Sequence, residues 1–208
     1  MGDPRSMPVW AVTGPIGGGK SLAVAELAVL GAAIIDADAE GHELLREQHI
    51  SAAIAEQFGQ EVMVGGAVDR SALGRLVFAD PEALARLNAL VHSRLSRRIA
   101  EKLQALAGAE SRPCLAVVEA AVYFLLPSFG EVDLVICVTA SEDARRKRLV
   151  ASGRFDVETA SARVAAQRPL LHDWIRSDIV LHNDGTAAEL RRTIHDLYRD
   201  RIRWKEAP

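Results

Sequence analysis

Short runs of apolar residues recur along the chain, each bounded by polar residues, glycine or proline. They cover residues 9–12, 32–35, 114–118, 134–138 and 179–181. Continuous apolar runs of this length are typical of strands that are buried on both faces of a sheet. Between them, apolar residues recur at three- and four-residue spacing, which is typical of helices. Strands alternating with helices predict an α/β, three-layer fold around a five-stranded parallel sheet.

The longest helical pattern begins at Asp80 and Pro81, a capping carboxylate followed by a proline in the first turn. Its apolar stripe consists of Leu84, Leu87, Val91, Leu95, Ile99, Leu103 and Leu106. Further helical patterns precede it over residues 39–48, 50–58 and 70–78, with a turn at 65–66 and a cap at Asp69. Residues 48–110 therefore read as a helical insertion between the second and third strands.

The first apolar run leads directly into a glycine-rich stretch with the spacing of a phosphate-binding loop. The loop consists of Gly14, Pro15, Ile16, Gly17, Gly18, Gly19, Lys20 and Ser21, and Leu22 follows in the next helix. Glycines let backbone N–H groups converge on phosphate, while Lys20 adds a charge at the β- and γ-phosphates and Ser21 a hydroxyl for Mg²⁺. A glycine-rich turn that binds nothing would leave Lys20 and Ser21 unexplained. We therefore expect a nucleoside triphosphate site.

Acidic residues follow two of the predicted strands. Asp36 and Asp38 end the second run, and Glu119 ends the third. Open parallel sheets bind ligands beyond the carboxyl ends of their strands, which is also where the phosphate loop must lie. These carboxylates and the loop are therefore expected to share one cleft.

Composition sets limits on this interpretation. The 208 residues and 49% hydrophobic content suit a single domain over 1–208, and the formal charge of -3 gives no reason to expect a nucleic-acid partner. No apolar run is long enough to span a membrane, so we expect a cytoplasmic protein. Cys114 and Cys137 lie in apolar runs and are expected to be reduced and buried. Residues 1–6 formally fit an N-myristoylation pattern, but we interpret them as a cloning remnant before a start at Met7.

Several further stretches resemble the dephospho-coenzyme A kinase family over nearly the whole chain. They are residues 35–38, 68–70 with Leu73, 77–82, 87–92, and 178–180 with Asn183 and Gly185. The resemblance implies a P-loop kinase that uses ATP with Mg²⁺ to phosphorylate the 3′-hydroxyl of dephospho-CoA, giving CoA and ADP. It also implies that the insertion over 48–110 binds the acceptor and that residues 141–176 form an arginine-bearing helical lid.

The resemblance also suggests roles for single residues, each with a plainer alternative. Asp38 is our candidate to orient the acceptor hydroxyl and take its proton, rather than only to cap a helix. His42 and His92 either contact the acceptor or are ordinary surface or core histidines. Glu119 either holds Mg²⁺ through water, alongside Ser21, or is a strand-end charge. Asn183 resembles an adenine-side loop residue but also suits a simple turn.

The chain departs from the family pattern in two places. After Glu119 it lacks the proline and the second carboxylate of the family pattern, so residues 119–125 differ from the family where the resemblance implies acceptor contacts. In the lid, Arg148 matches a family arginine, but Ser152 stands where a second one is expected. Arg154 and Arg145 are the candidates to compensate, because an arginine near the transferring phosphoryl group is worth about 10³–10⁵ in rate. Alternatively, these arginines form a solvated helix face.

The sequence thus supports three hypotheses. The first is the dephospho-CoA kinase reaction. The second is a kinase of the same fold with another small hydroxylated acceptor, as the changes at 120–125 and Ser152 would suggest. The third is an ATP-binding homologue without catalysis. The sequence does not indicate an oligomeric state.

Overall fold

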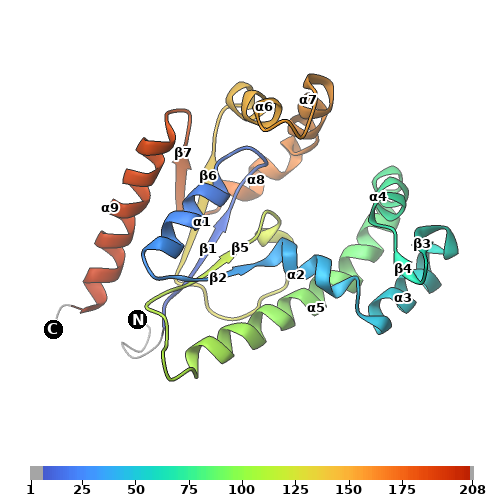
Figure 1. The fold of residues 1–208 in the computed structure, drawn as a ribbon, viewed down its shortest axis with the longest axis horizontal. Coiled ribbons are helices and arrows are strands. Elements are labelled where there is room, and N and C mark those ends of the chain that lie inside the picture. The colour runs from blue at the N-terminus through green and yellow to red at the C-terminus, as the bar shows by residue number, and fades with distance from the viewer. Residues whose placement is uncertain (1–6, 207–208) are drawn as a thin grey trace.

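A parallel five-stranded sheet forms the centre of the computed structural model, which describes residues 7–206 (Figure 1). Its strands are β1 (Val9–Thr13), β2 (Ala33–Asp36), β5 (Ala116–Glu119), β6 (Leu134–Thr139) and β7 (Ile179–His182). They run in the order β2-β5-β1-β6-β7, and every neighbouring pair is parallel. The predicted three-layer α/β fold is confirmed. Our interpretation of residues 1–6 lies outside the described residues.

Helices cover both faces of this sheet, which explains why its strands are apolar throughout. On one face, α1 (Lys20–Val29) and α9 (Ala187–Glu206) pack with residues such as Leu27 and Ile194 against the sheet. On the other face, α2 (Ala37–Leu44) and α5 (Pro81–Ala107) contribute residues such as Ile99. Because side chains alternate along a strand, Val117 points to the first core and Val118 to the second.

The first half of α5 belongs to a separate hydrophobic cluster away from the sheet. It packs there with α3 (Gln48–Phe58), a short 3₁₀ turn (Gln60–Val62) and α4 (Arg70–Ala79). Asp69 and Asp80 cap α4 and α5 as predicted. Two details differ from prediction: α2 ends at Leu44, short of residue 48, and the turn at 65–66 joins a hairpin of β3 (Met63–Val64) and β4 (Ala67–Val68).

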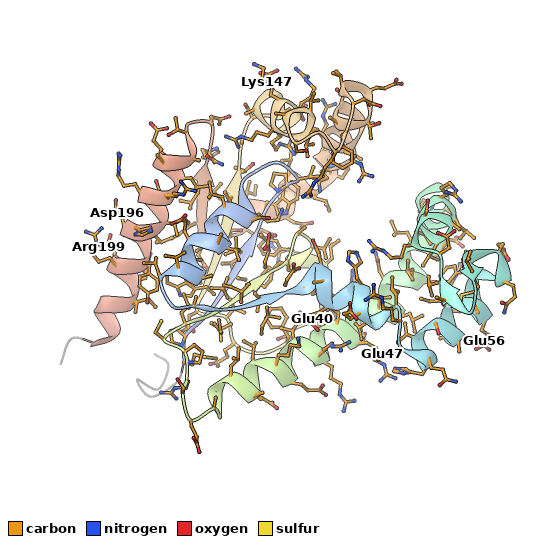
Figure 2. The ribbon with its side chains drawn as sticks, viewed as in Figure 1. Glu40, Glu47, Glu56, Lys147, Asp196 and Arg199 are labelled. Carbon is orange, nitrogen blue, oxygen red and sulfur yellow. The ribbon has the colours of Figure 1, made fainter. Side chains whose placement is uncertain are left out.

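Ion pairs fix α2 and the turn after it against α5. Glu40 and Glu47 are labelled where these segments meet (Figure 2). Arg98 of α5 lies between them, with Nε 3.0 Å from a Glu40 carboxylate oxygen and Nη1 2.7 Å from one of Glu47. Lys102 pairs with Glu40 as well. The base of the helical cluster is therefore anchored at the point where the chain leaves the sheet edge.

The segment after β6 forms a second group of helices, at the top of Figure 1. It contains α6 (Glu142–Ala151), α7 (Val157–Ala166), a 3₁₀ turn (Arg168–Leu170) and α8 (Leu171–Trp174). Leu149, Ala160 and Val164 make a small core of their own, and Ile16 of the phosphate loop packs against it. A further 3₁₀ turn (Tyr123–Leu125) follows β5. None of the helices within residues 7–206 is suited to crossing a bilayer.

The two cysteines differ in burial, so our expectation for one of them is wrong. Cys137 in β6 is buried as predicted, and burial raises the pKa of its thiol to about 11. Cys114 is exposed. Pairing in β5 begins only at Ala116, so Cys114 lies before the strand, with its Sγ 3.1 Å from the hydroxyl of Tyr198. The apolar run therefore begins before the buried strand does.

Candidate functional site

The phosphate loop connects the end of β1 to the start of α1, as predicted. It lies so close to β6 that a Cβ atom on Gly14 would stand 2.3 Å from the carbonyl oxygen of Val138. Gly14 also has a φ of 130°, which side-chain-bearing residues rarely adopt. Within the loop, the Gly18 N–H donates to the Pro15 carbonyl at 3.1 Å. Gly14 is thus required by both contact and backbone conformation.

The Lys20 ammonium lies beside this loop. Its Nζ donates to the carbonyl oxygens of Gly14 at 2.9 Å and Pro15 at 3.3 Å. Burial lowers the pKa of Lys20 from its ordinary value, whereas the nearby charges of Glu119 and Asp38 act in the opposite direction. The lysine therefore sits in a partly desolvated position with carboxylates close by, where an added anion would interact strongly with it.

Ser21 and Glu119 meet at the carboxyl edge of the sheet. The Ser21 hydroxyl donates to a Glu119 carboxylate oxygen at 3.2 Å, and Asp36 stands opposite Glu119 in the β2–β5 register. Burial is the main cause that raises the pKa of Glu119, and Asp36 adds to it, while Lys20 opposes both. Hard oxygen ligands of this kind suit Mg²⁺.

A dedicated cage of protein ligands is absent from the part of the chain that the structure describes. No three His, Cys, Asp or Glu side chains converge there. Mg²⁺ in kinases is commonly bound by one or two protein oxygens together with substrate phosphates and water. The pair of Ser21 and Glu119 fits that mode of binding.

The two aspartates after β2 have different surroundings. Asp36 caps α2, because its carboxylate accepts a hydrogen bond from the Ala39 N–H at 2.9 Å. The carboxylate of Asp38 has no hydrogen-bond partner among residues 7–206. Although Asp38 is exposed, partial desolvation of its carboxyl group raises its pKa, and the charge of Lys20 partly offsets this. Capping is therefore done by Asp36, and the Asp38 carboxylate is available for another role.

The two candidate histidines are both engaged by protein groups. His42 is exposed, and its Nε2 lies 2.7 Å from Nη2 of Arg70, so that His42 accepts and Arg70 donates. His92 is half-buried, and its Nδ1 lies 3.2 Å from the Leu125 carbonyl oxygen. Burial lowers the pKa of His92. His92 thus contacts the stretch after Glu119 that departs from the family pattern.

An open cavity of about 400 Å³ is lined by the phosphate loop, by α6 and by the residues that follow α6. Ser152 and Arg154 both contribute to its wall. Arg148 does so too, and donates to the carbonyls of Gly17 at 3.3 Å and Asn183 at 2.6 Å. The Ser152 hydroxyl donates back to Leu149 at 2.7 Å, within its own helix. The structure therefore brings Arg148 and Arg154 to the loop.

The side chains of Asn183 and Gln167 form hydrogen bonds with the backbone of the phosphate loop. Asn183 is buried and its Nδ2 donates to the Gly18 carbonyl at 2.9 Å, so this side chain braces the loop backbone. Gln167, which our sequence analysis missed, accepts from the Ile16 N–H at 2.8 Å. A single glutamine near the end of a helical pattern carries no local signal for such a contact, because its partner is far away in the sequence.

Comparison with known proteins agrees with this geometry. The family model described as dephospho-CoA kinase matches residues 9–189. The chain belongs to the dephospho-CoA kinase family. A dephospho-CoA kinase from Streptomyces avermitilis is 37% identical over 199 residues, covering 95% of each chain. One from Chlorobaculum tepidum is 34% identical over 193 residues, covering 90% of this chain and 91% of the relative.

Solved structures support the same fold. The crystal structure of TT1252 from Thermus thermophilus has a TM-score of 0.77 and 31% identity, covering 94% of this chain and 98% of the other. A shikimate kinase from Bacteroides thetaiotaomicron, at 13% identity and a TM-score of 0.53, covers 92% of this chain and 96% of its own. At that identity the likeness concerns the fold alone, which is that of the P-loop kinases.

Proposed function

We propose that this protein transfers the γ-phosphoryl group of ATP to the 3′-hydroxyl of dephospho-CoA, giving CoA and ADP. Membership of the dephospho-CoA kinase family supports this reaction. The observation that carries the proposal is the arrangement at one sheet edge: Lys20 beside the phosphate loop, the Ser21–Glu119 pair, and an Asp38 carboxylate that makes no hydrogen bond within residues 7–206. Phosphoryl transfer requires mainly positioning, charge neutralisation and a group near the attacking hydroxyl.

On the nucleotide side, the loop N–H groups and Lys20 would bind the phosphates, and the N-terminus of α1 adds its positive dipole end. Bound Mg²⁺ would neutralise phosphate charge. Ser21 and Glu119 are the residues proposed to hold it, directly or through water. Arg148 and Arg154 line the cavity beside the loop, from which they would approach the nucleotide. Asn183 keeps the loop in place from behind.

On the acceptor side, Asp38 is proposed to orient the 3′-hydroxyl and accept its proton. The hydroxyl oxygen then forms the new bond to the γ-phosphorus while the bond to the leaving ADP oxygen breaks. We assign acceptor binding to the cluster within residues 48–110, with His42 and His92 at its border, and lid movement to residues 141–176. Ion pairing of α2 to α5 through Arg98 would hold Asp38 in a fixed position between these parts.

Incubation of the purified protein with Mg-ATP and dephospho-CoA tests the reaction. We expect ADP and CoA to appear in equal amounts, measured by chromatography. CoA itself, whose 3′-hydroxyl already carries phosphate, is the matched acceptor control and should give no ADP above background. Turnover of adenosine or shikimate but not dephospho-CoA would favour a kinase with another acceptor. ATP binding without turnover of any acceptor would favour the non-catalytic alternative.

We expect Glu119→Gln to raise the Mg²⁺ concentration needed for half-maximal activity. The amide keeps the shape of the side chain but removes its charge, and loss of one such partner costs about 10- to 100-fold in metal affinity. Activity should be titrated with Mg²⁺ at a fixed, saturating ATP concentration. Glu142→Gln, which alters an exposed carboxylate paired with Arg168, is the control. An unchanged Mg²⁺ dependence in Glu119→Gln would show that Glu119 is an ordinary strand-end charge.

A further inference from the structure

Arg145 carries a guanidinium group in which two of the three nitrogen atoms are buried without a hydrogen-bond partner. Its side chain is 2% exposed and is the largest of the fully buried side chains in residues 7–206. Its Nε and Nη1 atoms are buried, and no described group accepts from them. Arginine stays protonated in proteins, and buried polar atoms nearly always have a partner. An unpaired buried charge is strongly unfavourable, so we expect an anionic ligand to pair with this guanidinium group.

The backbone of Arg145 lies against the phosphate loop, which is the place that we assign to that anion. Helix α6 packs directly against the loop: a Cβ atom on Gly17 would lie 3.0 Å from the Arg145 carbonyl oxygen and 3.2 Å from its Cβ. The charge of Arg145 is also among the causes that lower the pKa of Lys20. Two cations therefore share the neighbourhood of one loop, which suits a ligand with several negative charges.

No described carboxylate forms a hydrogen bond or an ion pair with Arg145. The acidic group that acts on its pKa is Glu142, but both oxygens of Glu142 accept hydrogen bonds from Arg168, at 2.9 and 2.8 Å. The acidic residues around the loop are Glu119 and Asp38, and their charges raise the pKa of Lys20. The positive charge at Arg145 is thus left over after the ion pairs of its surroundings are assigned.

The neighbouring basic residues of α6 are all engaged elsewhere. Arg146 and Lys147 pair with Asp143 on the exposed side of the helix. Arg148 is bonded to backbone carbonyls of the loop and of residue 183. Ser152, where the family resemblance leads us to expect an arginine, donates a hydrogen bond inside its own helix. Arg145 is therefore the cation that α6 holds against the loop without a partner among residues 7–206.

We propose that Arg145 neutralises the phosphate groups of the bound nucleotide and takes over the role that an arginine at position 152 would have. This inference rests on one part of the proposed function, which is that the protein binds ATP. It does not depend on which acceptor receives the phosphoryl group. The unpaired charge makes the protein without nucleotide less stable than a neutral residue would, and the phosphates relieve that cost on binding.

Binding of three ligands to Arg145→Met and Arg145→Lys tests the proposal. The ligands are Mg-ATP, inorganic triphosphate and adenosine, measured by calorimetry with no acceptor present. We expect Arg145→Met to weaken ATP and triphosphate binding about 10- to 100-fold, as for a lost hydrogen bond to a charged group, and to leave adenosine binding unchanged. Arg145→Lys should retain most of the affinity. Without ligand, Arg145→Met should melt at the same temperature as the wild type or higher.

The control is Arg146→Met, which removes an exposed, paired arginine from the next position and should change none of the three affinities. Equal loss for all three ligands, with a lower melting temperature, would mean that Arg145 only supports the fold and would overturn the proposal. Unchanged triphosphate affinity would overturn it as well. Should Arg145→Met fail to fold, Arg145→Gln provides a neutral side chain that retains polarity and carries the same prediction. Absence of turnover with dephospho-CoA would refute the proposed function while these binding results stand.

Discussion

Lys20→Ala is expected to reduce kcat/KM for ATP by at least about 10³-fold. The ammonium is the charge closest to the loop carbonyls, and its place between the loop and two carboxylates makes it the central cation of the site. Removing a single preorganised donor from a desolvated site already costs about 10²–10³ in rate, and this one also carries a full charge. Steady-state kinetics with varied Mg-ATP measures the loss.

A matched control for this variant is Lys102→Ala, which removes an exposed ammonium paired with Glu40 on α5. That variant should keep its activity, because its charge lies outside the phosphate site. Without nucleotide, the melting temperature of Lys20→Ala should remain near that of the wild type. Addition of ATP should raise the melting temperature of the wild type but not that of Lys20→Ala. Normal activity in Lys20→Ala would refute the role that we assign to the loop.

Asp38→Asn is expected to lower kcat by about 10²–10⁴-fold with little change in KM for ATP, because general-base help is lost while the loop remains intact. The pH profile offers a second measurement. Asp38 acts as a base only when ionised, and its pKa is raised above the ordinary 3.8. As the pH decreases, the wild type should therefore lose activity at a pH above the ordinary pKa of an aspartate. If kcat of Asp38→Asn equals that of the wild type, Asp38 is not the base.

The stability of Asp38→Asn separates catalysis from helix capping. The pKa of Asp38 is higher in the folded protein than in the unfolded chain. The folded state therefore loses stability as the pH rises from the unfolded-state pKa through the folded-state pKa. Replacing Asp38 by neutral asparagine should therefore leave the melting temperature at pH 7 unchanged or raise it. Asp36→Ala, by contrast, removes the cap of α2 and should cost about 1 kcal/mol. A marked fall in stability of Asp38→Asn would favour a structural role.

Local sequence patterns were sufficient for the five strands of the central sheet and for the main helices. Helix caps depend on residues only two or three positions apart, so they can be predicted from the local sequence. Examples are the caps at Asp69 and Asp80 and the reciprocal hydrogen bonds between Thr186 and Glu189. The phosphate loop is similarly local, since its glycines, lysine and serine are adjacent. The small hairpin at 63–68 was missed because each of its strands has only two residues and no alternating pattern.

Contacts between distant segments depended on the tertiary structure. Burial of Asn183 against Gly18, the pairing of His42 with Arg70 and the exposure of Cys114 all involve elements that meet only after the sheet has formed. In the sequence, Arg145 is one of several adjacent basic residues and looks like part of a solvated face. Its burial is decided by the rotation of α6 against the loop, where Gly17 permits close approach.

The sequence alone therefore determined that this protein carries a phosphate loop at the carboxyl edge of a parallel sheet, with acids at the same edge, because these features are set by adjacent residues and by strand direction. Only the tertiary structure decided which acid caps a helix, which arginines are already bonded, and which cation is left unpaired. Those distinctions depend on long-range packing, hydrogen bonding and desolvation, which no local pattern encodes.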